Sequence, residues 1–327
     1  MKQRLFVTLS LAGLAMSTFG ATKPKTAIKS LNKTTIQPTY TEWHDLQVNA
    51  INRFPLHTNF FTYPADDWVS EKDGKIVSKD ILHMNKAESK YFLSLDGTWK
   101  FNWVANADQR PTDFYKEDLD DSKWKTMSLP AIWEMYGFGD PEYVNNGFAW
   151  REHFNEQPPA VPTKDNHVGS YRRIIDIPAN WDGKQVVAHF GSVTSNIYLY
   201  VNGKFAGYAE DSKVAAEFDI TPYLKKGKNL IAFQTFRWCD GSWDEDQDFW
   251  RLSGVARESY LFARDAQLHL EDIRVTPDLV NNYKDGVLNI SAKVKGTGKL
   301  NFILFDKDGM TFLKKLSMAP SYFSSKM

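Results

Sequence analysis

Short runs of alternating hydrophobic and polar residues, broken by turn signals, fill the chain from about residue 42 to residue 265. One run, residues 196–201, is rich in β-branched and aromatic residues and leads directly into Asn202-Gly203, after which a second run covers residues 204–208. An Asn-Gly pair between two such runs is the strongest short-range signal of a β-hairpin, because both central residues of a type I′ turn need positive φ. We therefore predict a hairpin here.

The other predicted strands have the same short length and similar turn signals between them. They cover 93–103 (two segments around an Asp-Gly turn), 171–177, 186–190, 217–220, 229–238 and 259–262. Many short strands joined by tight turns indicate an antiparallel sandwich, and about eight or more strands favour a jelly roll. The fold class is thus predicted as all-β, with a jelly-roll domain over residues 42–265.

A second strand-rich segment begins near Leu268, with strands expected over 268–275, 286–294 and 299–305. An immunoglobulin-like sandwich needs roughly 100 residues and seven strands, more than the length that remains. We expect residues 266–327 to form an incomplete immunoglobulin-like domain, which the tail from Ser317 does not complete. A small three-stranded cap is the alternative, and it would leave an exposed edge strand.

The N-terminus has the features of a bacterial signal peptide. Lys2 and Arg4 precede an apolar run over residues 5–16, which is too short to span a bilayer comfortably, and small residues follow it. Cleavage after Ser17 or Gly20 fits this pattern. We predict a signal peptide over 1–20, a flexible polar leader over 21–41, and a periplasmic or secreted product. The alternative is an N-terminal core helix.

Charge and cysteine content exclude several classes of function. Lysine plus arginine number 40 and aspartate plus glutamate number 40, so no net charge attracts the chain to nucleic acid or to an anionic membrane. Cys239 is the only cysteine, which rules out an intrachain disulfide and a cysteine-based zinc site. We expect a packed thiol, no nucleic-acid partner and no membrane partner.

The densest group of chemically active side chains lies in residues 237–251. This segment holds five carboxylates, three tryptophans and a phenylalanine, with an arginine at each end. Carboxylates accept hydrogen bonds from sugar hydroxyls, and aromatic faces stack on the apolar C–H face of a sugar ring. The segment is therefore predicted to bind carbohydrate, and a purely structural corner is the alternative.

Calcium binding is a competing interpretation of the same segment. Asp244, Asp246 and Asp248 have the spacing that opens an EF-hand loop, but Phe249 and Val255 stand where that loop needs glycine and glutamate. An EF-hand is not expected, although a cation site of another type stays open.

Several segments together resemble the N-terminal half of family 2 β-galactosidases, over roughly residues 42–315. They are 43–64, 95–101, 129–145, 169–173, 211–220 and, most specifically, 237–254 with Arg-Trp-Cys-Asp-Gly-Ser and Glu-Asp-Gln-Asp-Phe-Trp-Arg. The resemblance implies a retaining exo-glycosidase that hydrolyses terminal β-galactosides (EC 3.2.1.23). Two glutamates serve there as acid/base and nucleophile, and both lie in a TIM barrel after the second sandwich.

The resemblance also implies roles for single residues. Asp240 corresponds to the aspartate that bonds a galactose hydroxyl and helps to hold a sodium ion, and Asn145 to an asparagine that touches the sugar from the same side. Asp248, Trp250 and Arg251 are expected to brace the loop.

For the enzyme as a whole, the resemblance implies no organic cofactor, sodium and perhaps magnesium near the site, and a homo-oligomer. The chain stops before the barrel, so we expect it to lack both catalytic glutamates and to be inactive alone. Asn155-Glu156 superficially resembles the pair that carries the acid/base, but it stands in a Pro158-Pro159 loop of the first domain and is not expected to be catalytic.

Other functions stay open from the sequence. A free-standing carbohydrate-binding module could use the same aromatic and acidic loop, and the chain could instead complement a separately encoded barrel. Within the family, β-glucuronidase and β-mannosidase are the nearest alternative activities, although the 237–254 pattern favours a galactosidase.

Overall fold

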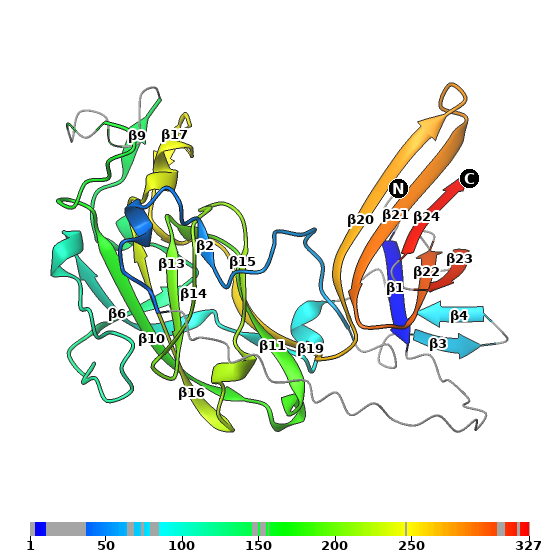
Figure 1. Cartoon of the computed structure of the whole chain (residues 1–327), viewed down its shortest axis with the longest axis horizontal. Helices are drawn as coiled ribbons and strands as arrows, with labels where there is room; N and C mark the ends of the chain where they lie inside the picture. Colours follow the sequence, from blue (N-terminus) through cyan, green and yellow to red (C-terminus); the bar gives the residue numbers. More distant parts are fainter. Residues whose placement is uncertain are drawn as a thin grey trace, which may run out of the picture. The chain divides into compact units, whose positions relative to one another are not determined.

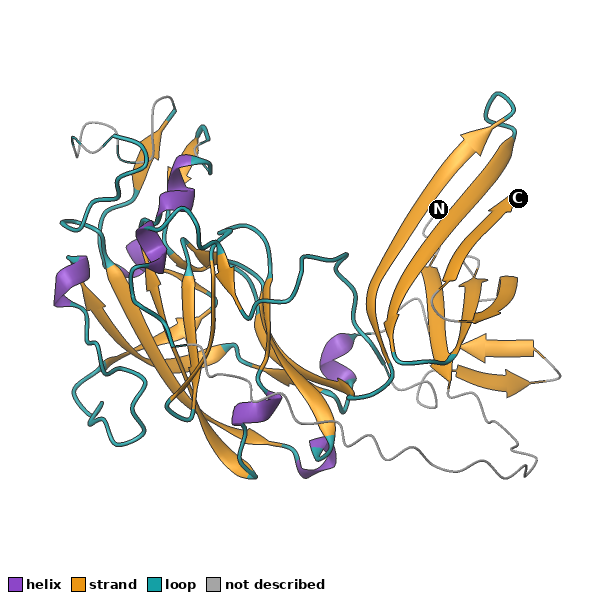
Figure 2. Ribbon diagram, in the orientation of Figure 1, coloured by secondary structure: helices purple, strands orange, loops and turns teal. Residues whose placement is uncertain are grey.

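The computed structural model describes residues 4–10, 37–63, 69–72, 75–78, 85–145, 150, 155, 157–245, 247–305, 311–318 and 321–326. Strands dominate these residues, and the helical elements among them are 3₁₀ turns of three or four residues (Figures 1 and 2). The prediction of an all-β chain is confirmed. Most of the predicted signal peptide and leader, residues 11–36, lies outside the described residues.

A sandwich of two antiparallel sheets forms the part of the chain predicted as a jelly roll. The first sheet has the order β2 (Ala50–Ile51), β14 (Lys204–Ala209), β13 (Ile197–Val201), β16 (Gly227–Phe236), β10 (Val168–Ile177), β6 (Gly97–Val104), β7 (Lys125–Leu129). The second has the order β15 (Ala216–Asp219), β11 (Lys184–Phe190), β19 (Ser259–Asp265), β5 (Phe92–Ser94). Strands that are neighbours in space are often distant in sequence, as a jelly roll requires.

The predicted hairpin is present as β13 and β14. Asn202 and Gly203 have φ values of 49° and 75°, the left-handed conformations that the turn demands. All five residues of β13 are buried. Ile197, Leu199 and Val201 face the second sheet, whereas Tyr198 and Tyr200 pack in a separate cluster on the other face. A strand buried on both faces explains why this run is almost continuously hydrophobic.

Aromatic rings fill the core between the two sheets. Tyr171 of β10 stacks on Phe233 of β16 with ring centroids 4.3 Å apart, and Trp99 meets Phe233 edge-on at 5.2 Å. Gly169 is needed beside them, because a Cβ there would lie 2.4 Å from the Trp133 ring. The core thus fixes β16, the strand that leads into residues 237–251 (the functional loop), and its neighbour β10.

An N-terminal segment, residues 40–51, covers the outer face of the seven-stranded sheet. Trp43 of η1 (Glu42–His44) stacks on Phe236 at 5.1 Å, and Glu42 accepts a hydrogen bond of 2.9 Å from the Tyr198 hydroxyl. The segment continues into β2, which pairs with β14 at the sheet edge. Order near Glu42 and Trp43 was expected, and both side chains are buried.

Two small sheets and the remaining 3₁₀ turns complete this sandwich. One sheet has the order β12 (Val193–Thr194), β18 (Gly254–Val255), β8 (Ala131–Ile132), and the other pairs β17 (Phe249–Arg251) with β9 (Glu142–Val144). The turns are η2 (Lys86–Glu88), η3 (Ala107–Gln109), η4 (Trp133–Tyr136), η5 (Ala179–Trp181), η6 (Thr221–Tyr223) and η7 (Asp240–Trp243).

The C-terminal part has its own sheets. One has the order β20 (His269–Val280), β21 (Asp285–Lys295), β24 (Ser321–Lys326), another the order β1 (Arg4–Ser10), β22 (Lys299–Phe305), β23 (Thr311–Met318), and a third pairs β3 (Val69–Lys72) with β4 (Lys75–Ser78). Leu288, Ile290, Leu300 and Phe302 form part of its core. The three strands predicted after Leu268 are confirmed as β20, β21 and β22.

Part of the predicted signal peptide lies in this C-terminal part. Residues Arg4–Ser10 form β1, which pairs antiparallel with β22 from Arg4↔Phe305 to Ser10↔Lys299. These residues are thus a strand and not the helix considered as an alternative. Cleavage of the segment stays a prediction.

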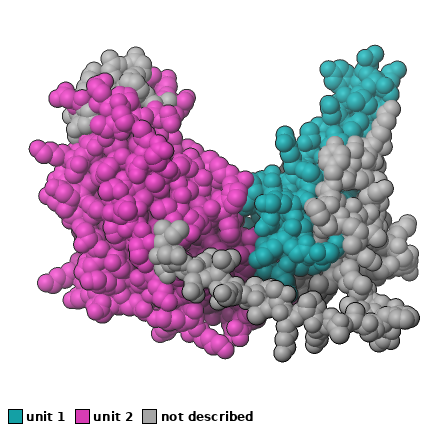
Figure 3. Space-filling view, in the orientation of Figure 1, with its two compact units in different colours: residues 1–36, 57–86, 265–327 teal, residues 37–56, 87–264 magenta. Residues whose placement is uncertain are grey.

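The chain divides into two compact units (Figure 3). One comprises residues 37–56 and 87–264, and the other comprises 1–36, 57–86 and 265–327. The predicted jelly-roll range of 42–265 thus differs from the first unit at residues 57–86, which group with the C-terminal strands. Among the residues that the structure describes, no helix is long and apolar enough to cross a membrane.

Candidate carbohydrate-binding site

The functional loop begins where β16 ends. Two hydrogen bonds fix the backbone of Phe236. Its N–H donates to Asn196 Oδ1 at 3.0 Å, and its carbonyl accepts from the Ser195 N–H at 2.8 Å. Asn166 then holds Trp238 in the manner of a neighbouring strand, accepting from its N–H at 2.9 Å and donating to its carbonyl at 3.0 Å. The chain therefore enters η7 in one defined conformation.

Asp240 is the first residue of η7, and local hydrogen bonds orient it. Its Oδ1 accepts from the Gly241 N–H at 2.9 Å, while the Cys239 N–H donates to Ser242 Oγ at 3.1 Å. The Asp240 residue is only 5% exposed. Its Oδ2 accepts no hydrogen bond from a nitrogen or hydroxyl donor of the described residues, so this oxygen is a buried acceptor.

Glu210 is the neighbour of Asp240 that reasoning from the sequence missed. It follows the last residue of β14, and its Oε1 accepts a hydrogen bond of 2.6 Å from the Tyr208 hydroxyl. Carboxylate oxygens of Glu210 and Asp240 and the Cys239 Sγ all lie within 4.8 Å of one another. A Cβ on residue 241 would stand 2.8 Å from Glu210 Oε2, which explains the glycine there.

Burial dominates the electrostatics of this group, which we call the carboxyl pair (Glu210 and Asp240). Burial raises the pKa of Glu210 to about 8, and the nearby negative charge of Asp240 contributes to the same shift. Burial also raises the pKa of Asp240, although hydrogen bonds to its charged form oppose the rise. Because the pKa of Glu210 lies near 8, this carboxyl stays mostly protonated at neutral pH.

Cys239, which is adjacent to the pair, is buried, and the prediction of a packed thiol is confirmed. Burial raises its pKa, and the adjacent Glu210 charge adds to that shift, so the thiol stays protonated. A protonated thiol is a poor ligand for sodium or magnesium, which prefer oxygen donors. The carboxylate oxygens of Glu210 and Asp240 do fit such a cation, because they are buried and lie within 4.8 Å of each other.

The other four predicted site residues meet on one two-stranded ladder. Residues Phe249, Trp250 and Arg251 of β17 pair with Val144, Tyr143 and Glu142 of β9, and extending this register places Asp248 opposite Asn145. The ladder therefore brings together Asn145, Asp248, Trp250 and Arg251, which come from segments about a hundred residues apart.

The inner side of this ladder is anchored to the sandwich. Arg251 is buried and its guanidinium lies 4.7 Å from the Phe249 ring centroid. Glu142 accepts from the Arg237 guanidinium at 3.2 Å. Arg237 also contacts His167 Nδ1 at 3.4 Å, and burial together with the Arg237 charge lowers the pKa of His167, which keeps this imidazole neutral. The expected bracing role therefore suits Arg251.

The three tryptophans of the loop do not share one role. Trp238 and Trp243 pack against the buried Trp150, with ring centroids 5.7 Å and 4.4 Å away, and the Trp243 indole N–H donates to the Ala160 carbonyl at 3.0 Å. These two rings therefore stabilise the conformation of the loop. Trp250 is 52% exposed instead, which does not suit the bracing role predicted for it.

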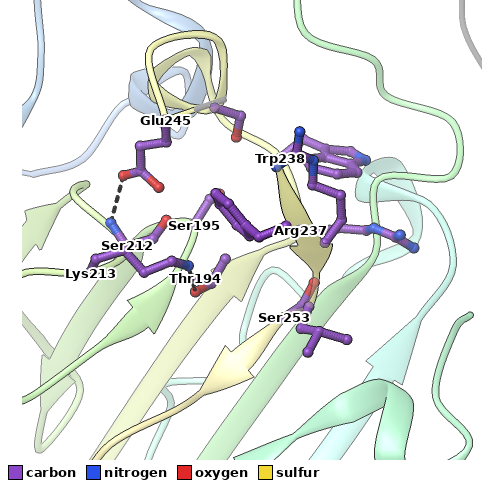
Figure 4. A pocket seen from close by; sticks show the side chains of 12 residues that line it. Thr194, Ser195, Ser212, Lys213, Arg237, Trp238, Glu245 and Ser253 are labelled. Atoms are coloured by element: carbon purple, nitrogen blue, oxygen red, sulfur yellow. Dashed lines mark hydrogen bonds between the residues drawn. The ribbon is translucent and has the colours of Figure 1, made fainter. Parts of the chain in front are cut away.

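A small pocket, partly open to solvent, lies beside the same loop (Figure 4). Glu245 Oε1 accepts from the Ser212 N–H at 2.7 Å, and the Lys213 ammonium contacts Thr194 Oγ1 at 3.4 Å. Burial lowers the pKa of Lys213. Asp240 does not line this pocket, so the carboxyl pair and the pocket are separate features.

Two other motifs of the sequence can be placed in part. Asn155 is exposed in the loop before Pro158, while Glu156 lies outside the described residues. Asp244 and Asp248 are exposed, and Asp246, between them in the acidic run, is also outside the described residues.

Comparison with known proteins agrees with the geometry. Residues 92–265, more than half of the chain, match the family described as glycosyl hydrolases family 2, sugar binding domain. The β-galactosidase of Priestia megaterium is 38% identical over 274 residues, which cover 84% of this chain and 25% of that protein. The β-galactosidase large subunit of Lactobacillus helveticus is 35% identical over 285 residues, covering 82% of this chain and 42% of that subunit.

Solved structures show the same fold. A β-glycosidase from Bacteroides vulgatus has a TM-score of 0.54 at 20% identity, covering 72% of this chain and 29% of that one, and a β-glucuronidase from Bacteroides uniformis has a TM-score of 0.54 at 21% identity, covering 72% and 27%. The chain spans between about a quarter and two fifths of the length of the curated relatives named above. By its sugar-binding domain, this chain belongs to family 2 of the glycosyl hydrolases.

Proposed function

We propose that the chain is the sugar-binding portion of a β-galactosidase (EC 3.2.1.23) that hydrolyses terminal, non-reducing β-D-galactosides with retention. Relatives that are 34–38% identical to the chain carry the name β-galactosidase. The resemblance of residues 237–254 to the galactosidase pattern supports the same substrate.

The buried Asp240 carboxylate is the observation that carries the proposal. Its Oδ1 is fixed by the Gly241 N–H and its Oδ2 is a buried acceptor. A preformed acceptor of this kind discriminates strongly in favour of a ligand that brings a hydroxyl donor, since an unmet buried acceptor costs about 1–3 kcal/mol. Asp240 thus binds a galactose hydroxyl, and Asn145 reaches the sugar from the neighbouring ladder.

Within this function the chain binds and orients, and it does not move the reacting proton. Retaining hydrolysis needs two carboxyl groups about 5 Å apart on either side of the glycosidic bond. We assign these two groups to the part of the enzyme that follows this chain in its longer relatives. The chain alone is therefore expected to bind galactose without hydrolysing galactosides.

Glu210 and Asp240 are the residues that would hold a sodium ion, with magnesium as a second cation of the complete enzyme and no organic cofactor. The cation would supply positive charge beside the sugar hydroxyl. The remaining partners of the proposal are the β-galactoside itself and further copies of the same enzyme, without nucleic acid or membrane. The sequence of residues 1–20 supports export to the periplasm or the medium.

Ligand-detected NMR on the purified chain tests the proposal. Galactose should show saturation transfer that Asp240→Ala abolishes and Asp244→Ala preserves, because Asp244 is an exposed aspartate of the same loop. Equal binding of galactose by both variants would contradict the role of Asp240.

Turnover of nitrophenyl-β-galactoside is the companion measurement. No turnover is expected, and turnover that Asp240→Ala abolishes would mean that catalytic carboxylates lie within these residues. Saturation transfer from glucuronate or mannose in place of galactose would favour a β-glucuronidase or a β-mannosidase.

A further inference from the structure

The outward side of the β9–β17 ladder carries two aromatic rings. Tyr143 and Trp250 are direct cross-strand partners, each 52% exposed, with ring centroids 5.6 Å apart and an angle of 57° between the rings. Side chains alternate between the faces of a strand, so Asn145 and Asp248 belong to the same side, and both are exposed. We call Tyr143, Asn145, Asp248 and Trp250 the outer face of the ladder.

This outer face is rigidly presented. The opposite side of the ladder is tied down by the buried Arg251 and by the 3.2 Å contact between Glu142 and Arg237. The two aromatic side chains lie on the side of the ladder that faces away from these buried contacts. Trp250 is the only tryptophan among the exposed large hydrophobic side chains of the described residues, whereas its loop neighbours Trp238 and Trp243 pack against Trp150.

The polar groups of the outer face are also arranged. The Tyr143 hydroxyl donates to Asp248 Oδ1, which fixes this carboxylate at the edge of the rings and raises the pKa of Tyr143. A carboxylate at the edge of two aromatic rings is the combination that recognises a sugar, because the rings stack on C–H groups while the carboxylate accepts hydroxyl hydrogen bonds. A face made for an apolar protein partner would not need a fixed, exposed carboxylate.

We propose that Tyr143, Asp248 and Trp250 form a second sugar subsite, which binds a further residue of a galactose-containing oligosaccharide whose terminal galactose is held at Asp240. This assignment of the two sugar positions rests on the proposed function, in which Asp240 binds the terminal galactose. Asn145 lies at the end of the same ladder, opposite Asp248 in the extended register. The enzyme that this subsite serves acts on oligosaccharides or polysaccharides, in preference to small aryl or alkyl galactosides.

Calorimetric titration of the whole chain with β-1,4-galactotetraose and with galactose tests the subsite. Trp250→Ala should weaken tetraose binding by about tenfold, which corresponds to the upper range for one aromatic contact, and should leave galactose binding unchanged. Trp250→Phe should restore part of the tetraose affinity because it keeps a ring. Tyr136→Ala, which removes a 58% exposed tyrosine elsewhere in the same unit, is the matched control and should change neither affinity.

The outcomes separate this inference from the proposed function. Tetraose binding that is insensitive to Trp250→Ala, or an intact chain that binds neither sugar, would overturn the subsite. Tetraose binding that needs Trp250 while galactose binding ignores Asp240→Ala would uphold the subsite and refute the proposed role of Asp240. Self-association of the chain that Trp250→Ala abolishes, with tetraose binding unchanged, would identify the outer face as a protein interface and overturn the proposal.

Discussion

The carboxyl pair and the outer face of the β9–β17 ladder hold their polar side chains in place in opposite ways. At the carboxyl pair, Glu210 and Asp240 are buried, and their geometry depends on backbone N–H groups and on Gly241. At the outer face of the β9–β17 ladder, the rings and the carboxylate are exposed, and the buried side of the ladder holds them in place. The difference teaches that substitutions at the buried pair should change the stability of the fold, whereas substitutions at the exposed face can leave it intact.

The largest expected effect comes from removing a buried ring, compared with removing an exposed one. Trp238→Ala should lower the free energy of unfolding by about 3–5 kcal/mol, because it removes a packed ring next to Trp150. Trp250→Ala should cost less than about 1 kcal/mol, since half of that side chain already faces water. Urea unfolding of both variants gives the comparison, and similar losses would mean that the two parts are not energetically distinct.

A smaller effect is expected from the proton on the carboxyl pair. The folded state keeps a proton on Glu210 up to a pKa of about 8, whereas the unfolded chain releases it near the ordinary glutamate pKa of 4.5. The unfolded state thus binds fewer protons between these values, and stability falls as the pH rises through this window. We expect a loss of roughly 2 kcal/mol, which allows for relaxation of the pair.

Glu210→Gln is the control for this pH effect. The amide cannot ionise, so the variant should show a flatter dependence of the free energy of unfolding on pH between about 4.5 and 8 than the unaltered chain. Chemical unfolding at a series of pH values measures the slope. A slope that the substitution leaves unchanged would assign the pH dependence to other groups.

Gly241→Ala should cost about 1–2 kcal/mol, because the new Cβ would stand 2.8 Å from Glu210 Oε2 and push this carboxyl away from Asp240. In a Glu210→Ala background the same substitution should cost much less. A double-mutant cycle in urea measures this coupling, and additive losses would show that the two residues do not press on each other.

The smallest effect belongs to the exposed part. Tyr143→Phe removes the hydroxyl that donates to Asp248 but keeps the ring against Trp250. Because both partners face solvent, the stability should change by less than about 0.5 kcal/mol. Tetraose affinity should fall modestly, and calorimetry that finds no change would mean that the fixed orientation of Asp248 is not needed for binding.

The sequence was informative where local rules decide the structure. The Asn202-Gly203 turn and the strand runs follow from turn chemistry and residue pattern, so the all-β sandwich was predictable. The pairing of Asp240 with Glu210 was not, because β14 and β16 meet only through β13, and sequence spacing carries no record of sheet order. Periodicity could not separate the exposed Trp250 from the buried Trp238 either, since an irregular loop has no repeating inward face.

The covering segment at residues 40–51 sets a limit on processing of the N-terminus. A signal peptidase or a later protease that stopped before Tyr40 would leave the seven-stranded sheet covered. Removal of Trp43 and Glu42 would uncover Phe236 and leave the Tyr198 hydroxyl without its carboxylate acceptor. Phe236 is also the last residue before the 237–251 loop, so the segment at residues 40–51 and this loop share one support.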